Sequence, residues 1–234
     1  QRQMCIRDRR LEASSGEWKA MVADEAARTT FAKNIKTVLE KNKLDGIDLD
    51  FEWAENEKEY KDYSLAILKM REVLGNKYLF SVSLHPVCYK ISKEAIEAVD
   101  FISLQCYGPS PVRFPIEKYC SDIQMVLEYG IPKEKLVAGV PFYGVTKDNS
   151  KKTEAYFNFV QNGLVTSPAQ NEVIYQGDTY VFDGQDNIRI KTRYAKEQKL
   201  KGMMSWDLAT DLPLSDSRSL LCLLYTSPSP RDTR

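Results

Sequence analysis

The sequence predicts an α/β fold of the (β/α)8 barrel type in which roughly strands four to eight are present. Strand-like and helix-like segments alternate along the chain, which is typical of a parallel sheet covered by helices. One strand carries three acids on one face and apolar residues on the other, which suits the interior of a barrel. No glycine-rich phosphate loop follows any strand, which disfavours the doubly wound nucleotide-binding sheet, the other closure open to this pattern.

The chain has 234 residues, of which 43% are hydrophobic, and 33 basic residues balance 33 acidic ones. This composition is typical of one soluble domain with a substantial core. The absence of net charge gives no electrostatic reason to expect a nucleic-acid or membrane-surface partner. No apolar run in the sequence is long enough to cross a bilayer.

The number and spacing of the cysteines argue against a zinc site but do not decide whether a disulfide forms. The five cysteines contain no C-x-x-C pair and there is a single histidine, which argues against a zinc site. An odd count argues against a disulfide framework, although one bridge among Cys88, Cys106 and Cys120 is possible. The redox compartment is therefore left open.

Both ends differ in character from the interior. Residues 1–10 lack an apolar period, and residues 222–234 end in alternating Ser-Pro and charge. Both resemble translated sequencing-adapter DNA. We therefore expect two non-native tails that flank a partial barrel domain over 11–221, and a gene that extends further upstream. This fits the barrel, because a complete one needs about 250 residues.

Apolar spacing and helix-ending residues predict the elements in order. A helix ends near Lys43, a second spans 57–74 before Gly75, a short one is capped by Ser92, and a fourth spans 115–129 before Gly130. A fifth helix covers 188–200. Residues 145–187 are polar with short β-like pieces, and we expect an inserted loop or hairpin with an embedded helix. The expected strands are 44–53, 78–84, 99–107, 136–144 and 201–211.

The strand at 44–53 carries the chemistry. Successive side chains of a strand point to opposite faces, so Asp48, Asp50 and Glu52 share one face and Ile47, Leu49 and Phe51 share the other. Cα atoms two positions apart are roughly 6.5–7 Å apart. Like charges at this spacing raise at least one carboxyl pKa.

Within this row, each acid has an expected role. Glu52, nearest the rim, is suited to hold a proton and act as general acid. Asp50 is expected to orient the substrate and answer developing positive charge, and Asp48 to share a proton with Asp50. A magnesium or calcium site is the alternative, but the spacing lacks the pattern of a calcium loop.

Other candidates follow the inward-facing side of later strands. Trp206 shares its strand face with Met204, which favours a sugar platform over a core role. Tyr107 shares its face with Gln105. Four residues complete the set of expected substrate contacts beside Trp206: Tyr143, Gln105, His85 and Trp53.

The stretch DGIDLDFE, residues 45–52, resembles the D-G-x-D-x-D-x-E signature of the family 18 glycoside hydrolases, which include chitinases and endo-β-N-acetylglucosaminidases. Later segments are similar to that family in the same order: QCY ending at Tyr107, GVPFYG at 139–144 and MMSWD around Trp206. SSGEW, at 14–18, resembles a degraded third-strand motif. Gly108 stands where the family carries aspartate, which leaves the substrate range open.

The resemblance implies substrate-assisted hydrolysis with retention of configuration and no cofactor. Glu52 would protonate the glycosidic oxygen, and the substrate's acetamido oxygen would attack the anomeric carbon. Asp50 would stabilise the oxazolinium ion and Tyr107 would hold the acetamido group. The expected partner is a polysaccharide or oligosaccharide of N-acetylglucosamine joined by β-1,4 linkages, as in chitin.

Two alternatives to a chitinase stay open. An endo-β-N-acetylglucosaminidase would act on N-glycan cores, and a non-catalytic chitinase-like protein would only bind carbohydrate. Non-catalytic relatives typically lose the acid, whereas Glu52 is present. The resemblance also implies a secreted or periplasmic protein.

Overall fold

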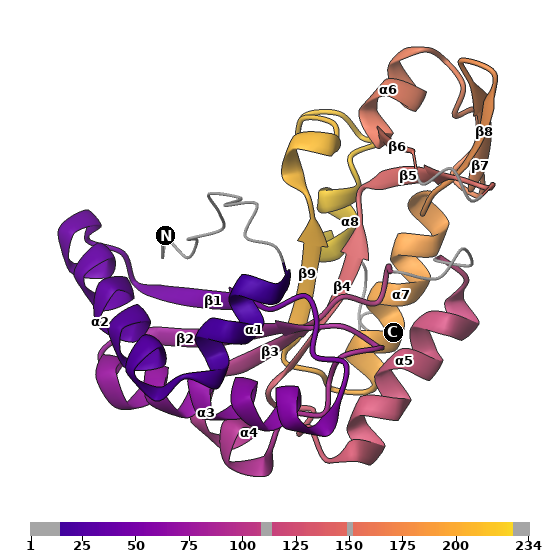
Figure 1. Ribbon diagram of the computed structural model, residues 1–234. Helices are drawn as coiled ribbons and strands as arrows, with labels where there is room; N and C mark the ends of the chain where they lie inside the picture. Colours follow the sequence, from indigo (N-terminus) through magenta and orange to yellow (C-terminus); the bar gives the residue numbers. More distant parts are fainter. Residues whose placement is uncertain (1–14, 109–113, 149–151, 227–234) are drawn as a thin grey trace. The chain divides into compact units, whose positions relative to one another are not determined.

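The computed structural model describes residues 15–108, 114–148 and 152–226 (Figure 1). The expected tail at 1–10 and the end of the second tail, 227–234, lie outside the described residues. The chain divides into two compact units. The first runs to Ser103 and includes 129–131, and the second holds 104–128 and the chain from Pro132 onward.

The first unit is built on parallel strands covered by helices. Strand β1 (Gly46–Asp50) pairs in parallel with β2 (Leu79–Leu84), and β2 lies between β1 and β3 (Phe101–Leu104), whose last residue is assigned to the second unit. Its helices are α1 (Ser15–Ala23), α2 (Glu25–Asn42), α3 (Glu57–Leu74) and α4 (Lys93–Ala98). Helix α3 packs against α1, α2 and α4.

The helix ends confirm the sequence predictions. Helix α2 ends at Lys43, which adopts a left-handed conformation with φ of 53°. Helix α3 spans the predicted 57–74, and Gly75 follows it with φ of 61°, which glycine adopts without steric cost. Ser92 caps α4, because its hydroxyl accepts the Ala95 N–H at 3.2 Å.

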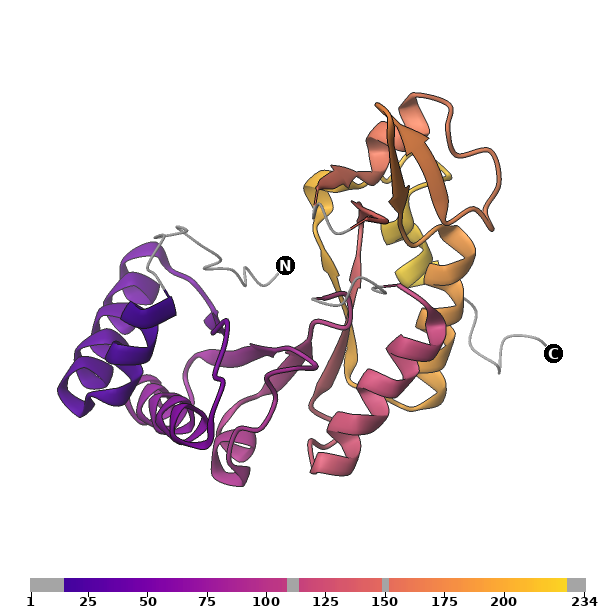
Figure 2. The same ribbon diagram turned by 45° about the vertical axis from the view of Figure 1, so that its right-hand side comes forward.

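The second unit contains a pair of parallel strands and an antiparallel sheet (Figure 2). Strands β4 (Leu136–Pro141) and β9 (Gly202–Trp206) pair in parallel, with Pro141 opposite Trp206. The second sheet is antiparallel in the order β6-β5-β8-β7. Its strands are β5 (Tyr143–Thr146), β6 (Thr153–Ala155), β7 (Glu172–Tyr175) and β8 (Asp178–Val181). The helical elements of this part of the chain are α5 (Ile116–Tyr129), α6 (Tyr156–Gln161), α7 (Gln185–Glu197), the 3-10 turn η1 (Leu208–Thr210) and α8 (Leu220–Thr226).

The antiparallel sheet and α6 occupy most of the stretch 145–187, for which the sequence predicts an inserted loop or hairpin with an embedded helix. That this stretch is an insertion stays a prediction. The antiparallel sheet begins before residue 145, because the expected strand 136–144 is two strands in different sheets. Phe142 donates its N–H to the Trp206 carbonyl at 2.8 Å, and from Tyr143 onward the chain pairs with β6 and β8. A continuous apolar run does not reveal such a break.

Several other predicted boundaries differ. The strand expected at 44–53 is only 46–50, and that expected at 99–107 is only 101–104. Helix α7 begins three residues before the predicted 188. The stretch expected to be a third-strand remnant is helical from Ser15 onward. Residues 222–226 were expected to fall in a tail, but they complete helix α8, in which Leu223 is buried.

A buried ion pair fixes the start of α7 within the second unit. The Lys191 Nζ lies 2.5 Å from the Asp183 carboxylate, and both side chains are almost fully buried. The Lys191 ammonium also lies 5.4 Å from the centroid of the Tyr119 ring. Burial raises the pKa of Asp183, which the charge of Lys191 opposes. The ion pair therefore joins the segment between β8 and α7, which contains Asp183, to α7, which contains Lys191.

The structure describes four of the five cysteines, and it also bears on whether any helix could span a membrane. Cys88, Cys106, Cys120 and Cys222 are free thiols, so the bridge left open among the first three is not formed. Burial raises the pKa of the Cys106 thiol to about 12. Within the described part of the chain, no helix combines the length and apolarity that a membrane span needs.

Close packing of β1 on β2 generates the first prediction. A Cβ atom on Gly46 would lie 2.2 Å from the Leu79 carbonyl oxygen, whereas one on Gly202 would meet nothing within 4 Å. We expect Gly46→Ala to lower the free energy of unfolding by about 1–3 kcal/mol, because backbone must shift to admit the methyl group. Gly202→Ala is the matched control. Equal urea-unfolding midpoints for the two variants would contradict the close approach.

Candidate active site

The acid row has the alternation that the sequence predicts. Ile47, Leu49 and Phe51 are buried, Asp48 and Asp50 are partly exposed, and Glu52 is exposed. The strand itself ends at Asp50. Glu52 therefore lies two residues beyond the sheet, in a segment without regular structure, and its side chain faces solvent.

Asp48 is held by two hydroxyl groups from β2. The parallel register places Asp48 opposite Ser81 and Asp50 opposite Ser83. Ser81 Oγ donates to Asp48 Oδ1 at 2.6 Å, and Ser83 Oγ donates to Asp48 Oδ2 at 2.7 Å. Each oxygen of this carboxylate thus accepts one hydroxyl, which favours its ionised form.

Asp48 and Asp50 lie two positions apart on one strand face, where like-charge repulsion disfavours two ionised carboxylates. The expected sharing of a proton between them stays a prediction. The expected rise of a carboxyl pKa in this row stays a prediction.

The apolar side of the strand packs on aromatic residues. The Phe51 ring lies 4.8 Å from that of Tyr63 on α3 and 6.3 Å from that of Trp18 on α1. The Tyr63 pKa is raised well above its ordinary value, first by burial and then by the charges of Asp48 and Asp50. Tyr63 therefore stays a neutral phenol beneath the acids and supplies them no charge.

The segment that carries Glu52 contacts the turn after β2. The Trp53 ring lies 5.2 Å from the His85 ring, and the Ala54 N–H donates to the Cys88 Sγ at 3.3 Å. His85 is only 3% exposed, so the structure gives it a packing role beneath Trp53. Its expected contact with substrate stays a prediction, as does that of the half-buried Trp53.

In the second unit, three predicted residues form one aromatic cluster. The Tyr107 ring lies 6.4 Å from the Tyr143 ring, edge to face, and Trp206 packs against the same group. The Tyr107 hydroxyl lies 3.8 Å from the Met204 Sδ. The expected shared face of Met204 and Trp206 is therefore confirmed by their common packing, with Trp206 half-buried.

A glycine permits this cluster. A Cβ on Gly139 of β4 would lie 2.9 Å from Tyr107 Cε1 and 2.7 Å from the Leu104 carbonyl oxygen. Gly139 therefore allows the Tyr107 ring to lie against the strand. Gln105, also predicted, is 8% exposed beside this position in the chain.

The predicted residues thus fall into two groups, one in each unit. The first unit holds Asp48, Asp50, Glu52, Trp53 and His85, and the second holds Gln105, Tyr107, Tyr143 and Trp206. Sequence reasoning missed four further members: Ser81 and Ser83, which bind Asp48; Cys88, which binds Ala54; and Phe114, which packs on Tyr143. The Ser-x-Ser pattern on a neighbouring inward face was the available signal for the serines. Nothing local indicated Cys88 or Phe114.

A metal site has no support in this arrangement. Across residues 15–108, 114–148 and 152–226, no three His, Cys, Asp or Glu side chains are grouped closely enough to hold a metal ion. Asp48 instead has hydroxyl partners, which donate hydrogen bonds to the carboxylate.

Comparison with known proteins gives a consistent result. The sequence profile of the glycosyl hydrolases family 18 matches residues 12–211. A probable chitinase 2 of Drosophila melanogaster is 23% identical over 261 residues, which cover 84% of this chain and 54% of the relative. The chain therefore spans about half the length of that curated relative.

Solved structures resemble the fold. A chitinase from Bacteroides thetaiotaomicron matches with a TM-score of 0.80 and 21% identity, covering 91% of this chain and 72% of that one. The chitinase ChiB from the chitin utilization locus of Flavobacterium johnsoniae matches with a TM-score of 0.76 and 25% identity, covering 91% and 69%.

The serine pair generates a second prediction. Ser81→Ala and Ser83→Ala should each lower the free energy of unfolding by about 1–3 kcal/mol, because each leaves one Asp48 oxygen without its hydroxyl donor. Urea unfolding measures the effect, with the exposed Ser215→Ala as the control. The hydrogen bonds carry no stabilisation if all three variants unfold at the midpoint of the parent chain.

Proposed function

The chain belongs to the glycosyl hydrolases of family 18, and from this premise we propose that it hydrolyses β-1,4 linkages beside N-acetylglucosamine in chitin or chito-oligosaccharides. The observation that carries the proposal is the acid row, in which an exposed Glu52 follows two carboxylates that the same strand face presents. The parallel strands with covering helices fit a (β/α)8 barrel, a fold whose active sites lie at the carboxyl ends of the strands.

In the proposed reaction, Glu52 gives its proton to the glycosidic oxygen as the bond to the anomeric carbon breaks. The acetamido oxygen of the substrate attacks that carbon from the opposite side and forms a cyclic oxazolinium ion. The Glu52 carboxylate then takes a proton from water, and the water oxygen attacks the anomeric carbon. The ring opens, the acetamido group is regenerated, and two inversions give net retention of configuration.

The remaining acids act electrostatically. Asp50, as a carboxylate, accepts a hydrogen bond from the acetamido N–H and stabilises the positive charge that develops on the oxazolinium ion. Asp48, held in a fixed position by Ser81 and Ser83, takes the proton that the two aspartates share while Asp50 is ionised. This division of roles requires no metal ion or organic cofactor.

Aromatic residues of the second unit are proposed to bind the sugar. The half-buried Trp206 offers a flat apolar face of the kind that stacks on a pyranose ring, and Tyr107 supplies a hydroxyl for the acetamido group. Tyr143 and Gln105 complete the proposed contacts. The proposal includes export from the cell, because polymeric chitin is degraded outside it.

Removal of the acid generates a third prediction. Glu52→Gln should lower turnover of chito-oligosaccharides by about 10²–10⁴-fold while sugar binding survives, because only the transferable proton is lost. Release of reducing sugar measures turnover, and calorimetry measures binding. Glu57→Gln, an exposed change in the first turn of α3, is the control.

Three outcomes, one of them from a parallel assay with a chelator, would redirect the proposal. Native turnover in Glu52→Gln would remove Glu52 from the reaction. Loss of turnover in a chelator would favour a metal-dependent hydrolase, which the proposed reaction does not predict. Sugar binding by a parent chain without turnover would favour the carbohydrate-binding alternative.

Substrate assistance generates a fourth prediction. A thiazoline analogue of N-acetylglucosamine mimics the oxazolinium ion but cannot be opened readily by water. It should inhibit competitively in a steady-state assay with chito-oligosaccharides. Failure to inhibit at high concentration would count against attack by the acetamido oxygen and would leave a different nucleophile to be found.

A further inference from the structure

Glu52 lies beyond the end of β1, so contacts other than strand pairing must hold its backbone in place. The ladder between β1 and β2 ends where Asp50 meets Ser83, so no strand pairing holds the backbone at Glu52. A general acid must lie within hydrogen-bond reach of the oxygen that it protonates. The residues that follow Glu52 must therefore supply the constraint that the strand does not.

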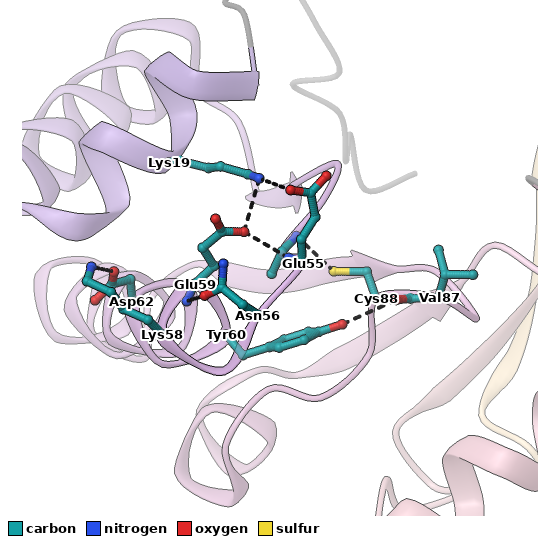
Figure 3. Close-up of polar contacts among 10 residues, drawn as sticks. Lys19, Glu55, Asn56, Lys58, Glu59, Tyr60, Asp62, Val87 and Cys88 are labelled. Carbon is teal, nitrogen blue, oxygen red and sulfur yellow. Dashed lines mark hydrogen bonds and ion pairs between the residues drawn. The ribbon is translucent and has the colours of Figure 1, made fainter.

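The first constraint is the Cys88 thiol. The Ala54 N–H donates to Cys88 Sγ at 3.3 Å (Figure 3). Cys88 is 1% exposed and closes a tight turn, in which His85 and Cys88 exchange backbone hydrogen bonds of 3.2 and 2.7 Å. The Tyr60 hydroxyl donates to the Val87 carbonyl at 3.2 Å and fixes this turn to α3.

The chemistry of the thiol suits an acceptor. Burial raises the pKa of Cys88, so its sulfur is a neutral thiol. A neutral sulfur accepts the amide hydrogen without placing a further negative charge near the acid row. The same turn supports Trp53 through the ring of His85.

The second constraint is the carboxylate of Glu59, in the first turn of α3. The Glu55 N–H donates to Glu59 Oε2 at 2.8 Å, and Lys19 on α1 lies 3.0 Å from the same oxygen and 2.7 Å from Glu55 Oε2 (Figure 3). The hydrogen bond from the Glu55 backbone and the Lys19 ammonium lower the pKa of Glu59, although burial opposes them. Glu59 is therefore an ionised acceptor.

We propose that Cys88 and Glu59 are positioning residues for Glu52, because their side chains hold the consecutive amides of Ala54 and Glu55, two and three residues after it. This inference rests on the proposed function of Glu52 as general acid. Both acceptors come from elements that are themselves fixed, the turn after β2 and the first turns of α3. Loss of either acceptor frees the backbone two or three residues from the acid, and a displacement of about 1 Å is enough to impair proton transfer.

The test uses two aryl β-chitobiosides that differ in their need for an acid. The 2,4-dinitrophenyl leaving group departs without protonation, whereas the phenyl leaving group requires it. We expect Cys88→Ala to lower kcat on the phenyl substrate by about tenfold or more and on the dinitrophenyl substrate by no more than about twofold. A merely structural defect lowers both equally, because it reduces the amount of folded protein.

Matched variants separate the acceptor from the packing. Cys88→Ser keeps an acceptor atom and should restore most of the loss on the phenyl substrate. Cys120→Ala, which removes a half-buried thiol from α5, is the control. If Cys88→Ala does not fold, Glu59→Ala provides the same test at a less buried position, and Glu59→Gln keeps an acceptor oxygen.

The outcomes distinguish this inference from the proposed function. Equal losses on both substrates in Cys88→Ala and Glu59→Ala would overturn the positioning role while the glycosidase stands. If the parent chain cleaves neither substrate, the proposed function fails. The hydrogen bonds to Cys88 and Glu59 are then tested by hydrogen exchange of the Ala54 and Glu55 amides. Exchange should be slow in the parent and at least about tenfold faster at the amide whose acceptor is removed. Unchanged exchange would overturn the inference that these side chains hold the segment.

Discussion

The hydrogen bonds between the Asp48 carboxylate and the hydroxyls of Ser81 and Ser83 are the interaction on which the rest of the site depends. A charged group in the interior of a sheet is costly unless donors compensate for the water it loses. Two serines at alternate positions of the neighbouring strand meet that requirement on both oxygens. Both oxygens of Asp48 thus have hydroxyl partners on the face that Asp48 and Asp50 share.

Because β1 ends at Asp50, the three acids Asp48, Asp50 and Glu52 are not held in the same way. Asp48 and Asp50 belong to the sheet and are positioned by its register. Glu52 lies beyond the sheet and is exposed, as its proposed role of proton donor to a bound sugar requires. Side-chain acceptors, and not strand pairing, hold the backbone that follows it. The sheet therefore fixes Asp48 and Asp50, whereas Glu52, only two residues further along the chain, is accessible to solvent.

The second unit supplies a different kind of chemistry. Tyr107, Tyr143 and Trp206 come from three separate segments but pack into one cluster, and Gly139 makes room for the first of them. These rings are held by one another and by Met204, so their faces are fixed before any ligand binds. This packing supports the proposed binding of a sugar, whose ring presents apolar C–H groups on its faces and hydroxyls at its edge.

The sequence by itself determined the local features. Helix limits at Lys43, Gly75 and Ser92 follow from capping and from backbone conformations that neighbours in the chain dictate. The two-residue period of a strand alone places Asp48 and Asp50 on one side. Tertiary structure decided what depends on distant residues. The serine partners of Asp48 lie 33 and 35 positions away, the thiol that holds Ala54 lies 34 away, and the break between β4 and β5 arises because the chain changes pairing partners. Such contacts are set by strand register and packing, which no local pattern encodes.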